Sequence, residues 1–372
     1  MIDRARCLRL FVGVAAVLLV IAWLSPQPGR VTDRGIYEAT TAQFPVRDCS
    51  DLQCFRVLVP LTLHLFPGSD DARWKSYAAI CNAAAAVALL PLCLAFGLSR
   101  RAALMATAVS ASGFGSLYTL HDPFTSDPLM FVLGPVLTYQ LLTDRIALAG
   151  VTAVIGVFAK EFAAAPVYAF AACAFVERRW QTALRAVVAG NYAFLTWVML
   201  TVSLMLGVHY TWGRNGVGSA NFSEGAALAM WLREQSWRGI ASAMFNEFGA
   251  LYLLVPVGLA LAPPRLRRLA LVSVPIAAVF CVVQQPDRAL WNFHYLIVPC
   301  AATVLGAAPP VLAWTTVALF AVGNLRLGAQ LPIAALSHVA IAGSLVLAAA
   351  TVVLALRGGM ERFHAAPAIG LS

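Results

Sequence analysis

The chain alternates between long apolar runs and short polar segments along its 372 residues. As α-helices, such runs are long enough to cross roughly 30 Å of hydrocarbon, whereas the strands of a membrane barrel are short and alternate in polarity. The pattern therefore predicts an all-α, polytopic transmembrane protein with one membrane domain over residues 1–372. Twelve spans are predicted, at residues 10–24, 74–98, 102–120, 129–142, 146–159, 162–176, 186–208, 248–262, 269–283, 295–307, 311–325 and 332–356.

The longest polar segments between these spans are predicted to be outer loops. They cover residues 25–73, 209–247 and 284–294. In the first loop, residues 33–44 have helix-compatible spacing, and residues 55–66 (FRVLVPLTLHLF) predict a short helix at the membrane interface. The second loop starts with Gly, Asn and Ser and continues as an amphipathic pattern, which is typical of an interfacial helix or of a lid over a site.

Composition and charge support a membrane class and an orientation. Hydrophobic residues make up 60% of the chain and charged residues only 12%, whereas soluble domains carry about 25% charged residues. With both termini in the cytoplasm, the inner segments hold 14 arginines and four acids, and the outer segments hold 12 basic and 13 acidic residues. Positive charge gathers in short cytoplasmic loops, so the net charge of +9 is explained by orientation and not by nucleic-acid binding. The expected location is a bacterial-type inner membrane.

Two of the eight cysteines, Cys49 and Cys54, lie in the first polar loop. In an oxidising compartment they are close enough in sequence to form a short-range disulfide. Two unpaired thiols are the alternative.

The segment Thr32–Pro60 has a high density of ionisable residues beside an apolar run. Asp33 follows the first predicted span by a few residues, and Tyr37 and Glu38 come one helical turn later. At the edge of low dielectric the pKa of a carboxyl rises, which suits a general base. The alternative is a solvated loop acid.

A second acidic segment, HDPFTSDP, lies between the third and fourth predicted spans. Asp127 precedes a proline and an apolar run, a pattern typical of a helix cap. Asp122 has less structural explanation, and the neighbouring His121 can exchange a proton near neutral pH.

Five further residues are candidates for binding an anionic substrate. Lys160 and Glu161 lie between two apolar runs, where ionisable residues are costly and usually functional, although a structural pair at a tight turn is the alternative. If the pair is functional, Lys160 would bind an anionic group as a compact cation. Arg288 and His294 follow the ninth predicted span, and Arg56 precedes the apolar VLVPLTL, where an arginine can also simply snorkel from a helix end.

Five features occur together in this chain: a short basic start, one span, an outer loop opening with D-R-G-I-Y-E, the segment F-R-V-L-V-P, and acids in the outer loops. Together they make the chain similar to the GT-C superfamily of polytopic glycosyltransferases. The resemblance implies a polyprenyl-phosphate-sugar donor, a lipid or glycan acceptor, and a catalytic or metal-binding acid at Asp33. It also implies a second outer-loop acid near the active site, at Asp122. Arg34 stands where the family more often has a paired acid, which leaves Glu38 as a helper and leaves a divalent metal as one option.

Other classes fit parts of the pattern. Twelve spans with both ends inside also fit a secondary transporter, with Lys160 and Glu161 as a coupling site, but the two halves show no repeat. A non-catalytic scaffold is a third option. An intramembrane serine protease is disfavoured because the chain has no G-x-S-x-G motif.

Overall fold

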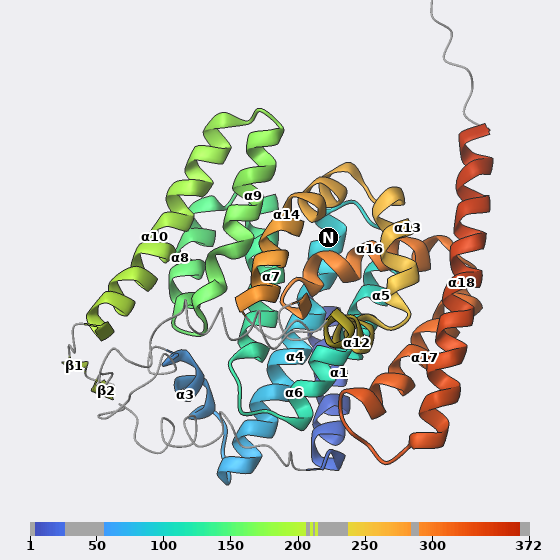
Figure 1. Ribbon diagram of the computed structural model, residues 1–372, viewed down its shortest axis with the longest axis horizontal. Helices are drawn as coiled ribbons and strands as arrows, with labels where there is room; N and C mark the ends of the chain where they lie inside the picture. The colour runs from blue at the N-terminus through green and yellow to red at the C-terminus, as the bar shows by residue number, and fades with distance from the viewer. Residues whose placement is uncertain are drawn as a thin grey trace, which may run out of the picture.

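The computed structural model describes residues 4–26, 56–205, 209–210, 213–214, 237–283 and 290–364, and these form an all-helical bundle apart from one two-residue strand pair (Figure 1). The elements are α1 (Arg4–Leu24), α3 (Leu58–Leu63), α4 (Asp70–Ala95), α5 (Arg100–Ala111), α6 (Phe114–His121), α7 (Asp127–Leu142), α8 (Ile146–Val157), the 3₁₀ helix η2 (Glu161–Ala164), α9 (Ala165–Val176), α10 (Trp180–Met205), β1 (His209–Tyr210), β2 (Gly213–Arg214), α12 (Trp237–Phe248), α13 (Leu251–Leu261), α14 (Pro264–Val283), α16 (His294–Ala307), α17 (Pro310–Leu327) and α18 (Ala334–His364). β1 and β2 are antiparallel, with His209 opposite Arg214 and Tyr210 opposite Gly213.

Six helices of the described residues are long and apolar enough to cross a membrane. They are Arg4–Leu24, Asp70–Ala95, Arg100–His121 (α5 and α6 taken together), Trp180–Leu200, Pro310–Leu327 and Ala334–Arg357. Five more apolar helices are shorter, at Asp127–Leu142, Ile146–Val157, Glu161–Val176, Leu251–Leu261 and His294–Ala307. The helical class is confirmed, and the count of twelve spans stays a prediction because helices of this shorter length cover less than the full hydrocarbon thickness.

Hydroxyl side chains set the start of two of these helices. Ser69 accepts a hydrogen bond from the Ala72 amide at 3.4 Å before α4, and Ser99 accepts one from the Ala102 amide at 3.2 Å before α5. Serine is among the preferred residues at the position before a helix, since it satisfies an amide that has no helical partner.

The predicted span at residues 102–120 is divided, because α5 ends at Ala111 and α6 begins at Phe114. The break gives space to the indole of Trp291, which is fully buried and donates to the Ser116 hydroxyl at 3.2 Å. A side chain at Gly113 or Gly115 would lie within 2.4 Å of that indole. A uniform apolar run does not reveal such a break, because the partner that requires it lies far away in the sequence.

The buried apolar residues form two clusters. The larger one joins α4, α5, α7, α8, α9, α10, α12, α13, α14, α16, α17 and α18, and the smaller one joins α1, α3, α4 and α6. Helices far apart in the sequence are thus held together by apolar contact and close approach, as at Gly258 of α13, which packs against the backbone of Cys300 in α16.

The bundle has two chemically different ends. The turns after α4, α7, α9 and α13 meet around one cavity, and we call this the arginine-rich end, with the α9–α10 turn at the upper edge of Figure 1. α3, the α6–α7 loop and the α8–η2 turn lie at the opposite end. Arginines at the arginine-rich end are Arg100, Arg101, Arg145, Arg178, Arg179, Arg265, Arg267 and Arg268. Their grouping agrees with the charge bias that led to the predicted orientation.

We predict that Gly258→Ala destabilises the fold. Alanine at an ordinary helical glycine is stabilising by roughly 0.5–1 kcal/mol, but here the added Cβ would lie 1.9 Å from the Cys300 carbonyl oxygen, which belongs to the backbone. Forcing α13 and α16 apart should cost about 1–3 kcal/mol, seen as a lower midpoint of thermal unfolding in detergent. Gly13→Ala is the control, because a Cβ there meets nothing within 4 Å. Equal midpoints for the two variants would contradict this packing.

Candidate functional site

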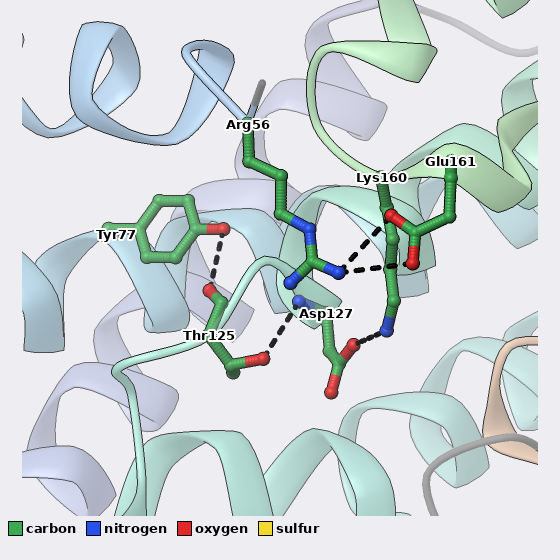
Figure 2. Close-up of polar contacts among 6 residues, drawn as sticks. All are labelled: Arg56, Tyr77, Thr125, Asp127, Lys160 and Glu161. Carbon is green, nitrogen blue, oxygen red and sulfur yellow. Dashed lines mark hydrogen bonds and ion pairs between the residues drawn. The ribbon is translucent and has the colours of Figure 1, made fainter. Parts of the chain in front are cut away.

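Four charged side chains meet at the end of the bundle opposite the arginine-rich end, and we call them the four-charge cluster: Arg56, Asp127, Lys160 and Glu161 (Figure 2). The Arg56 Nη2 atom donates to the two carboxylate oxygens of Glu161 at 3.0 and 3.1 Å. The Lys160 ammonium donates to Asp127 Oδ1. The cluster therefore consists of two adjacent ion pairs, built from three segments of the chain.

The turn between α8 and η2 supplies both Lys160 and Glu161. Lys160 has an extended backbone (φ −164°, ψ 142°), which separates the end of α8 from the 3₁₀ helix that follows. Its amide still donates to the Gly156 carbonyl at 2.9 Å, so the turn stays attached to α8. Successive side chains in an extended segment point in opposite directions, and this break lets Lys160 reach α7 while Glu161 reaches Arg56.

A backbone hydrogen bond brings Arg56 to this turn. The amide of Leu58, at the start of α3, donates to the carbonyl of Phe158 at 3.0 Å. Arg56 therefore lies beside Glu161 because its own chain segment is bonded to the residues that precede Glu161. The sequence separation between Arg56 and Glu161 is 105 residues.

Asp127 is the first residue of α7, and its position is set by the loop before it. Its amide donates to the Thr125 hydroxyl at 3.3 Å, and the Tyr77 hydroxyl of α4 donates to the Thr125 carbonyl at 3.1 Å (Figure 2). The helix-cap interpretation of Asp127 differs from what the structure shows, since the capping position is held by Ser126, and the Asp127 carboxylate instead meets Lys160. A carboxylate in the first turn of α7 is also stabilised by the helix dipole.

The two ion pairs differ in their access to solvent. Lys160 and Asp127 expose only 3% and 1% of their side chains, whereas Arg56 and Glu161 expose 14% and 20%. The cluster therefore has an enclosed pair beside a more accessible one.

The remaining predicted residues are distributed differently. Asp122 is half-buried at the C-terminal cap of α6, where its amide donates to the Tyr118 carbonyl at 2.8 Å, and it belongs to the loop that leads to Asp127. Asp33, Glu38 and Arg288 lie outside the described residues, as do Cys49 and Cys54.

His294 is enclosed in the bundle. It is the first residue of α16 and fully buried, with Nδ1 3.1 Å from the Trp291 carbonyl oxygen and its ring against Phe131 and Trp291. It does not share the accessible surface of Arg56 and Glu161. A contact of His294 with a phosphate stays a prediction.

Sequence reasoning identified Arg56, Lys160 and Glu161 as candidates but assigned Asp127 to a structural role. The signal for Asp127 was an ionisable residue at the edge of an apolar run, which is costly without a partner of opposite charge. Lys160 is the only lysine in the apolar region that follows Asp127. A predicted pairing of Lys160 with Asp127 would therefore have identified the site from the sequence.

The site belongs to an all-helical protein whose long apolar helices are compatible with an integral membrane protein. Comparison with protein-family models gives no match, and comparison with curated protein sequences gives none either. Within the described residues, no three His, Cys, Asp or Glu side chains group in a way that could hold a metal ion. The residues themselves therefore carry the argument for function.

We predict that Lys160→Met strongly destabilises the protein and that adding Asp127→Leu restores most of the loss. The single change leaves the buried Asp127 carboxylate without Lys160, which costs about 3–5 kcal/mol, whereas apolar replacement of both partners is often neutral. The measurement is the thermal unfolding midpoint of each variant in detergent.

The control for this pair is Arg73→Gln. Arg73 pairs with Asp70 at 3.4 Å on an exposed surface of α4, and such pairs contribute roughly 0–1 kcal/mol. A Lys160→Met variant as stable as Arg73→Gln would show that the Lys160–Asp127 pair is not needed for the fold.

Proposed function

We propose that this protein is a polytopic membrane glycosyltransferase of the GT-C type, which moves a sugar from a polyprenyl-phosphate donor to a hydroxyl of a lipid or glycan acceptor. The observation that supports it most is the four-charge cluster. Two cations and two carboxylates, drawn from three distant segments, are brought together at the end of the bundle opposite the arginine-rich end.

In this proposal the arginine-rich end faces the cytoplasm and the four-charge cluster faces the outer side of a bacterial-type inner membrane. The concentration of arginine at one end is what the positive-inside rule expects. Both termini are then cytoplasmic, and the shorter apolar helices enter the membrane beside the six long ones. A lipid-linked donor could approach the cluster laterally, with its prenyl tail against the apolar helices.

The cations of the cluster would bind the donor phosphate. A phosphate oxygen can take the place of a carboxylate beside Arg56, since an arginine binds either group through two parallel hydrogen bonds. The pair of Arg56 with Glu161 is the more accessible one, so exchange is expected there first. Lys160 lies behind it and adds positive potential. Arg288 remains a proposed third cation.

The reaction breaks the bond between the anomeric carbon of the sugar and the phosphate oxygen. Polyprenyl phosphate leaves with the electron pair, and Arg56 and Lys160 stabilise the negative charge that develops on it. The acceptor hydroxyl attacks the anomeric carbon from the opposite face and gives its proton to Asp33, so the configuration inverts. Glu38 and Asp122 are the proposed supporting carboxylates, and a divalent metal is not required by these steps.

The buried pair of Lys160 and Asp127 also fits the alternative of a secondary transporter. Ionisable pairs enclosed between helices are typical of ion-coupling sites. The accessible Arg56–Glu161 pair at the end of the bundle favours the transferase, because a lipid phosphate needs such access.

The direct test is incubation of the purified protein in detergent with radiolabelled prenyl-phosphate sugars and a separation of transferred, hydrolysed and intact donor. Transfer or hydrolysis supports the proposal. Solute uptake into proteoliposomes without either product supports the transporter instead.

We predict that Asp33→Asn lowers the rate of sugar transfer on the order of 10²–10⁴-fold, since a general base contributes an effect of this size. Its thermal midpoint should equal that of the wild type. Asp51→Asn, in the same polar segment, is the matched control and should keep its activity. Full activity in Asp33→Asn would remove Asp33 from the mechanism.

For the donor site, Arg56→Gln should raise the KM for the prenyl-phosphate sugar about tenfold, in line with the loss of one charge-assisted hydrogen bond. The KM for the acceptor should change little, and steady-state kinetics with each substrate varied separately measures both. Arg73→Gln, at a partly exposed arginine of α4, serves as the charge-matched control. Equal effects on both KM values would place Arg56 outside the donor site.

A further inference from the structure

A cavity of about 760 Å³ lies at the arginine-rich end, where the turns after α4, α7, α9 and α13 meet. The four-charge cluster takes no part in it, and the proposed transfer reaction does not use it. Its size is in the range of small-molecule and headgroup sites.

Three arginines line this cavity. Arg179 and Arg268 share the carboxylate of Glu177, with nitrogen–oxygen distances of 3.4 and 2.7 Å, and Arg265 lines the same cavity. Arg179 and Arg268 expose about half of their side chains, at 48% and 51%. Asp144 is the second acid of the lining, after Glu177. The lining therefore holds three guanidinium groups and two carboxylates, so its charge is positive overall.

Buried apolar side chains also line the cavity. Phe96, Leu141, Phe170 and Leu269 are among them and are all nearly inaccessible. A ligand in this cavity therefore meets both cationic and apolar groups. That combination suits an amphiphile with an anionic group.

The turn between α9 and α10 borders both the cavity and a separate apolar groove. Glu177 and Arg179 line the cavity, while Phe175 and Trp180, on either side of them in sequence, line a separate apolar groove between α9 and α10. Phe175 and Trp180 are 58% and 56% exposed. The groove is about 520 Å³ in volume and continues along α10.

We propose that this cavity binds the headgroup of an anionic phospholipid, with the phosphate at the three arginines and one acyl chain in the groove between α9 and α10. Basic pockets between membrane helices are suited to phosphate-bearing lipid headgroups. A water-soluble phosphate compound would use the arginines but would leave the apolar groove without a ligand. The inference concerns lipid binding alone, so it stands or falls separately from the transferase reaction.

The phosphate is recognised by charge-assisted hydrogen bonds from the guanidinium groups, which bind phosphate in a bidentate manner. Arg265 and Arg268 both come from the first turns of α14, whereas Arg179 comes from the α9–α10 turn. A headgroup bound between them would therefore connect α9 and α14. Because the arginines are partly exposed, the affinity should fall as ionic strength rises.

The experiment uses the purified full chain in a neutral detergent, with native mass spectrometry to count bound lipids. Phosphatidylglycerol is titrated against phosphatidylcholine of the same acyl length. The proposal expects one retained phosphatidylglycerol per chain and at least about tenfold weaker binding of phosphatidylcholine.

The Arg265→Gln/Arg268→Gln variant should weaken the binding of phosphatidylglycerol about tenfold or more, because it removes two of the three arginines of the cavity. The control Arg4→Gln/Arg357→Gln removes the same charge from exposed arginines outside the cavity lining, and it should bind as the wild type does. Thermal unfolding of both variants without added lipid checks that each is folded.

A competition experiment distinguishes a lipid headgroup from a water-soluble phosphate compound as the ligand of the cavity. Glycerol phosphate, which has the charge without the acyl chains, should compete only weakly with phosphatidylglycerol. Competition by glycerol phosphate at the affinity of the lipid would overturn the role of the groove. If both double-arginine variants lost the binding of phosphatidylglycerol equally, the lipid would be held by general surface charge alone. That result would overturn the proposed site.

Discussion

The buried ion pair between Lys160 and Asp127 is the constraint on which the four-charge cluster depends. Enclosing two charges is costly, and only a close partner offsets that cost. The pair therefore holds the α8–η2 turn against the first turn of α7. Once that turn is in place, Glu161 is directed to Arg56, and the accessible pair follows from the enclosed one.

The asymmetry between the two ends of the bundle gives each end a different chemistry. At one end, opposite charges are matched and partly enclosed, which suits a site that handles a charged group with defined geometry. At the other end, positive charge exceeds negative charge and remains exposed around a cavity. A transferase with its reaction at one membrane face and a lipid contact at the other would use both features.

The class of the fold could be predicted from the apolar runs, because a helical membrane bundle needs long runs whatever its contacts are. The positions of Arg56, Lys160 and Glu161 as candidates could also be predicted, since ionisable residues beside apolar runs are few. Their pairing could not, because the residues that meet are far apart in the chain. Asp127 is the clearest example, since its local pattern describes the start of a helix and contains nothing about Lys160.

The backbone bond from Leu58 to Phe158 has a consequence for the speed of ligand exchange. It ties the segment that carries Arg56 to the turn that carries Glu161, so the two side chains can part without any movement of the main chain. Separation of the Arg56–Glu161 pair therefore requires rotation of two partly buried side chains and not a helix or domain motion, which takes microseconds or longer. Steps of a catalytic cycle that are as slow as those motions should arise elsewhere in the molecule.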